Sequence, residues 1–197
     1  MSDEIRDHIL DAAEQCIIEA GYSNRLHAAI CERSGYSRPT VYKYVGDQDA
    51  IITALGRREL KRFFALAIPA LATPKALTEL IVDTVVLAVS HARGHRLLQA
   101  MLRNHPDVVL PLYTLNSGPA IGLAIAGFEP HIRAAVEAGL FPPVDARLLV
   151  EWTFRLAASL ITTPGIVVTA DADNDPVRLR AYVQGFVDLL VAGQGHP

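Results

Sequence analysis

Residues 21–52, GYSNRLHAAICERSGYSRPTVYKYVGDQDAII, decide the fold of this chain. The pattern predicts a helix over 26–33, a tight turn over 34–36 and a second short helix that follows it. Ser37 is a good cap for the second helix because its hydroxyl accepts a hydrogen bond from a first-turn N–H. Pro39 fits the same turn because its missing N–H has no intrahelical acceptor there. This spacing is typical of a helix-turn-helix.

The second helix of this motif has one apolar side and one polar, aromatic side. Gly35 lets the backbone turn between the helices, and Ile30, Val41 and Val45 are expected to lock the two helices together. No acidic residue occurs over 35–46, so the opposite side of the second helix is suited to a negatively charged partner. We therefore expect this side to be free to enter the major groove of DNA.

Four runs in register make the motif recognisable: GY at 21–22, ICERSGYS at 30–37, TVYKY at 40–44 and DAII at 49–52. Together they resemble the TetR family of bacterial transcriptional regulators, over about residues 5–55. The resemblance implies an all-α homodimer with an N-terminal DNA-binding domain of three helices and a connecting fourth helix. It also implies a divergent C-terminal domain that binds a small ligand and forms the dimer.

The resemblance also points to residues that contact DNA. Tyr42 and Lys43 are the main candidates, followed by Arg38 and Thr40, with phosphate contacts from Ser37. Tyr44 and Arg25 complete the set. For Tyr42 and Tyr44 the alternative is a partly buried aromatic ring that closes the turn.

Composition and charge set the protein class. Of the 197 residues 51% are hydrophobic and 20% charged, which excludes a disordered chain, and two cysteines exclude a secreted disulfide scaffold. Residues 1–19 hold six acidic and one basic side chain, whereas residues 20–62 hold eight basic and four acidic ones. The basic segment is a candidate footprint for a polyanion, although such a run is more often a solvated face.

Almost every other segment reads as helix. Apolar spacing predicts a first helix up to Gly21, and Asp47 is expected to cap a long fourth helix that Pro69 or Pro74 closes. Further helices are expected over 75–93, 95–104, 107–116, 119–139, 145–163 and 176–193. Ile166–Val168 is the nearest approach to a strand and is too short. We expect a DNA-binding domain over 1–46, a connecting helix over 47–73, and a ligand-binding and dimerisation domain over 74–197.

The last two expected helices are apolar on more than one side, which favours burial against both their own core and a second subunit. A single deep core is the alternative. Dimerisation places two recognition helices about 34 Å apart, matching half-sites one duplex turn apart. Aliphatic composition favours a largely apolar effector. The candidate pocket residues are Met101, His105, Tyr113, Phe128, Trp152 and Arg155.

Enzyme, metal and membrane functions receive little support. His91 and His95 have the spacing of two metal ligands, but Gly94 lies between them, so we expect no metal site. No nucleophile or phosphate-binding motif occurs, so we expect neither an enzyme nor a cofactor. Residues 108–128 are uncharged, but proline and glycine break them, which favours a buried helix pair. The N-terminus lacks the pattern of a signal peptide, and we expect a cytoplasmic protein.

One alternative function stays open at this point. Leu26 stands where a hydroxyl residue commonly caps the first helix of the motif, and Gln48 stands where a lysine is common. A degenerate helix-turn-helix of this kind is compatible with an all-helical module that binds another protein. A ligand-responsive regulator, released as a repressor from a palindromic operator, is the preferred interpretation.

Overall fold

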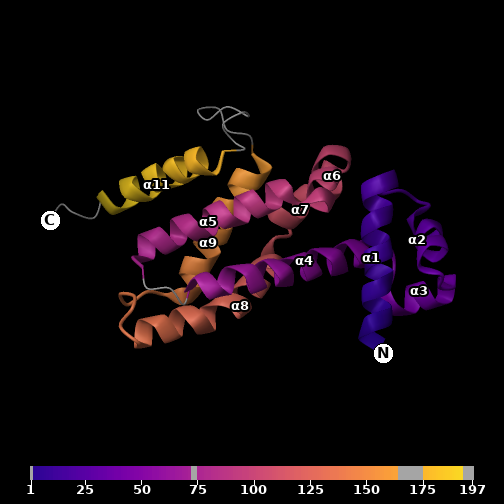
Figure 1. The fold of residues 1–197 in the computed structure, drawn as a ribbon, viewed down its shortest axis with the longest axis horizontal. Helices are drawn as coiled ribbons and strands as arrows, with labels where there is room; N and C mark the ends of the chain where they lie inside the picture. Colours follow the sequence, from indigo (N-terminus) through magenta and orange to yellow (C-terminus); the bar gives the residue numbers. More distant parts are fainter. Residues whose placement is uncertain (1, 72–74, 164–174, 193–197) are drawn as a thin grey trace. The chain divides into compact units, whose positions relative to one another are not determined.

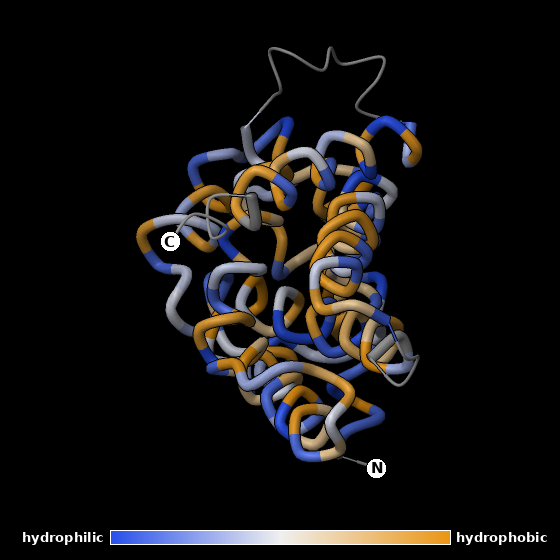
Figure 2. The backbone as a smooth tube through the Cα atoms, turned by 90° about the vertical axis from the view of Figure 1, so that its left-hand side faces the viewer, coloured by the Kyte–Doolittle hydropathy of each residue, from blue (hydrophilic) through white to orange (hydrophobic). Residues whose placement is uncertain are grey.

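The computed structural model describes residues 2–71, 75–163 and 175–192, and within them every regular element is an α-helix (Figure 1). The all-α prediction is therefore confirmed. Apolar residues recur along the helices between hydrophilic ones, which is the amphipathic pattern that predicted them (Figure 2). The expected boundary at Pro74 and the segment Ile166–Val168 lie outside the described residues.

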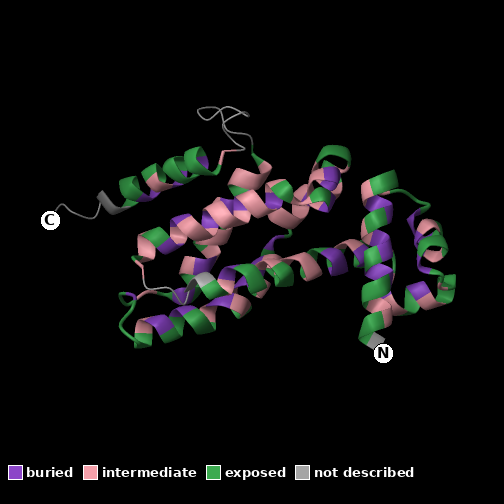
Figure 3. Ribbon diagram, viewed as in Figure 1, coloured by how far each residue is buried: buried purple, intermediate pink, exposed green. Residues whose placement is uncertain are grey.

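The chain divides into two compact units, the first formed by residues 1–61 and 95–112. In it α1 packs against α2, α3 and α6. Its core holds Ile9, Leu10 and Ile17 of α1, and Figure 3 shows buried residues recurring along that helix. The helices of this unit are α1 (Ser2–Ala20), α2 (Leu26–Ser34), α3 (Arg38–Val45), the first part of α4 (Gln48–Leu71), α6 (Arg96–Asn104) and most of α7 (Pro106–Tyr113).

The second unit contains residues 62–94 and 113–197. Within it α5 packs against both α9 and α11, and α8 packs against α9. The core between α5 and α11 consists of valine and leucine side chains: Val82, Val85, Val89, Leu179, Val183 and Val187. The helices are the rest of α4, α5 (Leu77–Gly94), α8 (Gly118–Glu137), α9 (Ala146–Thr162) and α11 (Pro176–Ala192).

The start of α4 follows the predicted signal. Asp47 precedes α4, and its Oδ1 accepts a hydrogen bond from the Ala50 N–H at 2.9 Å, which confirms the expected cap. Of the two prolines expected to close α4, Pro69 does not end it, because the helix continues to Leu71, and Pro74 lies outside the described residues. Pro69 lies so close to the helix end that the lost backbone hydrogen bond affects only the last turn.

The two units group the chain differently from the predicted domains. Residues 95–112 belong to the unit of the N-terminal helices because α6 packs against α1. The predicted boundaries at residues 46 and 73 separate a DNA-binding domain, a connecting helix and a ligand-binding domain by their functions, and this division stays a prediction.

No single described helix is long and apolar enough to cross a membrane. Only α7 and α8 taken together have the required length and hydropathy, and they are bent at a break. The interruption of the uncharged stretch over 108–128 thus agrees with the predicted broken pair.

An ion-pair cluster fastens α11 to α5 in the second unit. Asp83 accepts hydrogen bonds from Lys75 Nζ at 2.7 Å and from the Arg180 guanidinium. Burial alone raises the pKa of Asp83, but the two cationic donors outweigh it, so the pKa lies below its ordinary value. The charged form of Asp83 therefore stabilises the fold.

This cluster predicts how stability depends on pH. The contribution of Asp83 is fully present above its unfolded pKa of about 3.9 and is lost as the pH falls through its lower folded pKa. Asp83→Asn is expected to lower the free energy of unfolding at pH 7 by about 1 to 2 kcal/mol, since Arg180 is half-exposed. Denaturant unfolding should show this difference shrinking below pH 4, and a difference that persists at pH 2 contradicts the assignment.

Candidate DNA-binding surface

The turn between α2 and α3 has the geometry that the sequence predicts. Gly35 has a φ of +73°, a left-handed conformation that strains other residues, and its N–H donates to the Cys31 carbonyl at 3.0 Å. Ser37 caps α3, since its Oγ accepts from the Thr40 N–H at 3.4 Å. The Ser37 and Thr40 hydroxyls are also bonded to each other at 2.9 Å. Both ends of the turn are thereby fixed.

Helix α3 buries one side and exposes the other. Val41 and Val45 are 0% and 5% exposed, which confirms the predicted lock. Arg38, Tyr42 and Lys43 of the same helix are exposed. The outer side of α3 is thus polar, aromatic and basic, as a surface for phosphates and base edges requires. We call Arg38, Tyr42 and Lys43 the outer surface of α3.

Aromatic rings order this outer surface. The Arg38 Cζ lies 5.7 Å from the centroid of the Tyr42 ring, and the Lys43 Nζ lies 5.6 Å from that of Tyr44. Cation–π attraction at these distances restrains both basic side chains. Tyr42 is 42% exposed, whereas Tyr44 is half-buried. The alternative role, a partly buried ring that closes the turn, therefore suits Tyr44 better than Tyr42.

A buried histidine beneath Tyr42 was missed by the sequence analysis. His27 of α2 is 5% exposed, its ring stacks on Tyr42, and its Nε2 lies 3.0 Å from the Gly46 carbonyl. Since a carbonyl only accepts, Nε2 carries a proton and donates. The available signal was a histidine between the apolar residues Leu26 and Ile30 of a short helix.

The remaining predicted contacts lie around the start of α2. Arg25 is exposed at the N-cap position of α2, and its side chain does not cap the helix. Gln48 instead donates from Nε2 to the Ser23 carbonyl at 2.6 Å, which fastens the start of α4 to this loop. The amide of Gln48 therefore has a structural role in this unit.

One member of the basic segment does not belong to any DNA-facing surface. The Arg58 side chain is 12% exposed and donates to Asp11 and Glu14 of α1, at 2.7 Å in each case. It therefore ties α4 to α1. Arg57 and Lys61, its neighbours on α4, are exposed.

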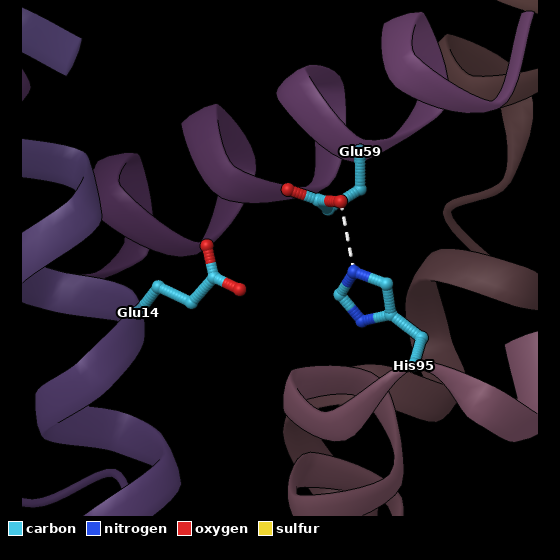
Figure 4. Close-up of side chains that lie close together, drawn as sticks. All are labelled: Glu14, Glu59 and His95. Atoms are coloured by element: carbon cyan, nitrogen blue, oxygen red, sulfur yellow. Dashed lines mark hydrogen bonds and ion pairs between the residues drawn. The ribbon is translucent and has the colours of Figure 1, made fainter.

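Glu14 of α1, Glu59 of α4 and His95, the N-cap of α6, lie close together in the first unit, with ligand-type atoms within 4.8 Å of one another (Figure 4). His95 Nδ1 accepts from the Leu98 N–H at 3.2 Å, so Nε2 carries the proton and donates to Glu59 at 2.8 Å. Metal binding needs a lone pair on that nitrogen, and Arg58 already neutralises Glu14. The cluster thus acts as a hydrogen-bonded link between α1, α4 and α6.

Two of the predicted pocket residues lie in the first unit. Met101 is buried in α6, and His105 follows the end of that helix. His105 Nε2 accepts the Tyr22 N–H at 3.0 Å, and the two rings meet edge to face. His105 thus joins α6 to the loop after α1. The roles of Met101 and His105 in ligand binding stay predictions.

The other four predicted pocket residues lie in the second unit. Phe128 is buried and packs edge to face on Phe64, with the ring centroids 5.1 Å apart. Burial raises the pKa of Tyr113 to about 12. Trp152 is 64% exposed, and Arg155 is exposed and paired with Glu151. Trp152 lies on α9, one of the two helices expected to be apolar on more than one side. Ligand contacts by all four stay predictions.

A family model described as bacterial regulatory proteins, tetR family, matches residues 9–55. An uncharacterized HTH-type transcriptional regulator of Mycobacterium bovis is 26% identical over 159 residues, 81% of each chain. A second one, from Mycobacterium tuberculosis, is 26% identical over 190 residues, covering 94% of this chain and 84% of its own. The family model and both relatives support a transcriptional regulator of the TetR family, as the sequence predicts. The prediction that it is not an enzyme is confirmed with it.

Solved structures of TetR-family proteins share the whole fold. The repressor QsdR of R. erythropolis has a TM-score of 0.65 at 18% identity, with 94% of this chain and 96% of QsdR covered. The repressor AlkX of Dietzia sp., implicated in biodegradation of n-alkanes, has a TM-score of 0.66 at 19% identity, covering 93% and 95%. FadR of Bacillus subtilis, in complex with stearoyl-CoA, has a TM-score of 0.58 at 18% identity, covering 92% and 96%.

The outer surface of α3 in this TetR-family chain gives a test by salt dependence. Each phosphate that a cation neutralises adds about 0.9 to the slope of log affinity against log salt. Lys43→Ala is therefore expected to lower the slope by about that amount, measured by fluorescence anisotropy on a bound genomic fragment. Arg133→Ala, which removes an exposed charge from α8, is the matched control. Equal slopes for Lys43→Ala and the unaltered protein contradict the assignment.

Proposed function

We propose that this regulator is a repressor that binds a palindromic operator as a homodimer and is released by a small, largely apolar effector. The observation that carries the DNA contact is the outer surface of α3. Arg38, Tyr42 and Lys43 are exposed there while Val41 and Val45 hold the other side of the helix in the core. Tyr42 and Lys43 make the main contacts, with Arg38, Ser37 and Thr40 beside them and Tyr44 and Arg25 at the margin.

Two apolar stripes on α11 support dimerisation. Leu179, Val183 and Val187 form the stripe that is buried against α5. A second stripe holds residues four apart that are exposed in the single chain, Tyr182, Phe186 and Leu190. Apolar side chains at this spacing on a solvent-facing side are typical of a helix that a partner covers. On α9, Leu148 and Trp152 are exposed at the same spacing.

The dimer also explains how a short helix achieves specificity. A single eight-residue helix reads few base pairs, whereas two copies about 34 Å apart read both halves of a palindrome. We place the interface on α9 and α11, since exposed aromatic residues occur on both helices.

Trp152 is the only tryptophan in the sequence, and it therefore reports on the dimer. In the dimer its emission should be shielded from acrylamide, and dilution should expose it. Phe186→Glu is expected to weaken dimerisation by ~10-fold or more, because a charge is buried without a partner. Sedimentation velocity measures the mass of the unaltered protein and of the Phe186→Glu variant.

Leu115→Glu provides the matched control for this substitution. Leu115 is 93% exposed and lies outside α9 and α11, so its replacement should leave the dimer intact. A monomeric unaltered protein, or a Phe186→Glu variant that dimerises as tightly, refutes the proposed interface. The dilution experiment needs no substitution, and it remains decisive if the variant does not fold.

An apolar effector fits the aromatic residues of the second unit. Phe64 and Phe128 pack together, and burial raises the pKa of Tyr113 to about 12, so its hydroxyl is a neutral hydrogen-bonding group. Gly127 leaves little room beside Phe64, since an added Cβ would lie 3.0 Å from its ring. Two solved structures of this fold concern apolar compounds: FadR was solved in complex with stearoyl-CoA, and AlkX is implicated in biodegradation of n-alkanes.

The effector is tested on the protein–operator complex. We use stearic acid, stearoyl-CoA and n-hexadecane as probes, and we expect at least one to weaken operator binding by about 5- to 150-fold. Operator DNA must then weaken binding of that probe by the same factor. Tyr113→Phe tests whether the buried hydroxyl bonds the polar end of the probe. Unchanged operator affinity with all three probes contradicts an effector of this class.

A further inference from the structure

The stack beneath the outer surface of α3 gives α2 a part in DNA binding. We propose that His27, a buried residue of α2, is a positioning residue that holds Tyr42 in the orientation in which it contacts DNA. This inference rests on the proposed function of Tyr42 as a DNA contact. Its structural basis is the near-parallel stacking of the two rings, together with the hydrogen bond from His27 to the end of α3.

The two rings are in close contact. Their centroids are 4.3 Å apart and their planes differ by 11°, which is a stacked arrangement. His27 is 5% exposed and Tyr42 is 42% exposed, so the inner ring face of Tyr42 rests on a side chain that belongs to the core. Helices α2 and α3, which supply the two rings, pack against each other (Figure 1).

His27 is itself held in place by the end of α3. Its Nε2 donates to the Gly46 carbonyl at 3.0 Å, and the Gly46 N–H donates in turn to the Tyr42 carbonyl at 3.0 Å. One side chain therefore contacts α3 twice, at a ring and at the backbone one turn further on. Two contacts on one rigid helix fix the imidazole, and the imidazole fixes the phenol ring.

A basic side chain also lies near the Tyr42 ring. The Arg38 Cζ lies 5.7 Å from the ring centroid, while the imidazole of His27 stacks on the ring. The face that His27 covers is closed to a base, which favours a contact through the edge that carries the hydroxyl. Tyr42 should therefore bind through a hydrogen bond from its hydroxyl to a phosphate or a base edge.

Positioning increases affinity because the ring is ordered before DNA arrives. A side chain that is fixed in its bound orientation loses less conformational entropy on binding than a free one. A purely structural role for His27, in which it only fills the core, predicts a loss of stability that does not depend on Tyr42. The two roles therefore differ in whether His27 acts through Tyr42.

A double-mutant cycle on the full-length protein separates the two roles. His27→Leu is expected to weaken operator binding by about 3- to 10-fold, the factor that a stacked aromatic pair contributes. In a protein that already carries Tyr42→Ala, the same substitution should change the affinity less than twofold. Tyr42→Phe should lose as much affinity as Tyr42→Ala, since only the hydroxyl makes the contact.

Two further variants show which contact of His27 matters. His27→Phe keeps a ring under Tyr42 and should retain most of the affinity. His27→Gln keeps a donor for Gly46 without a stacking ring, and it should lose affinity as His27→Leu does. His27→Gln also replaces His27→Leu if the leucine variant does not fold, which circular dichroism determines beforehand.

Val89→Ala is the matched control. Val89 is fully buried in α5, outside the helix-turn-helix, and its shortening should lower stability without altering operator affinity. If His27→Leu lowers operator affinity by the same factor in the unaltered protein and in the Tyr42→Ala variant, the inference is overturned. The proposed DNA contact of Tyr42 is then unaffected. Unchanged affinity of Tyr42→Ala would overturn the proposed contact of Tyr42, and the inference with it.

Discussion

Burial of Val41 and Val45 is the constraint on which the rest of this structure depends. These two side chains fix which side of α3 faces the core, and an eight-residue helix then has only one other side to offer. Gly35 and the Ser37 cap set where the helix begins, so the direction of Arg38, Tyr42 and Lys43 follows from local chemistry. DNA binding by this chain is thus a consequence of how a short helix is held.

Local signals were sufficient to predict the helices and the turn. Helical spacing of apolar residues, the glycine with positive φ and the Ser37 and Asp47 caps each act within a few residues, and each is visible in the sequence. The sequence did not decide between Pro69 and Pro74 as the end of α4, and Pro69 lies inside the helix because a proline near a helix end costs too little to stop the helix earlier.

The roles of Arg58, Gln48 and His27 could not be predicted, because their partners are distant in the sequence. Arg58 pairs with α1 across more than forty positions, although the sequence places it in a basic run. Gln48 and His27 bond backbone carbonyls, which carry no residue-specific signal. The candidate pocket had the weakest basis in the sequence, since apolar residues that line a cavity and those that fill a core have the same pattern.

The central claim is that two copies of the outer surface of α3 read DNA one duplex turn apart. Hydroxyl-radical and methylation footprinting on a genomic fragment that the protein selects tests it most directly. We expect two protected major-groove patches with centres about 10 base pairs apart, or a multiple of that spacing, related by the symmetry of the site. A single protected patch, or protection of the minor groove alone, would contradict it.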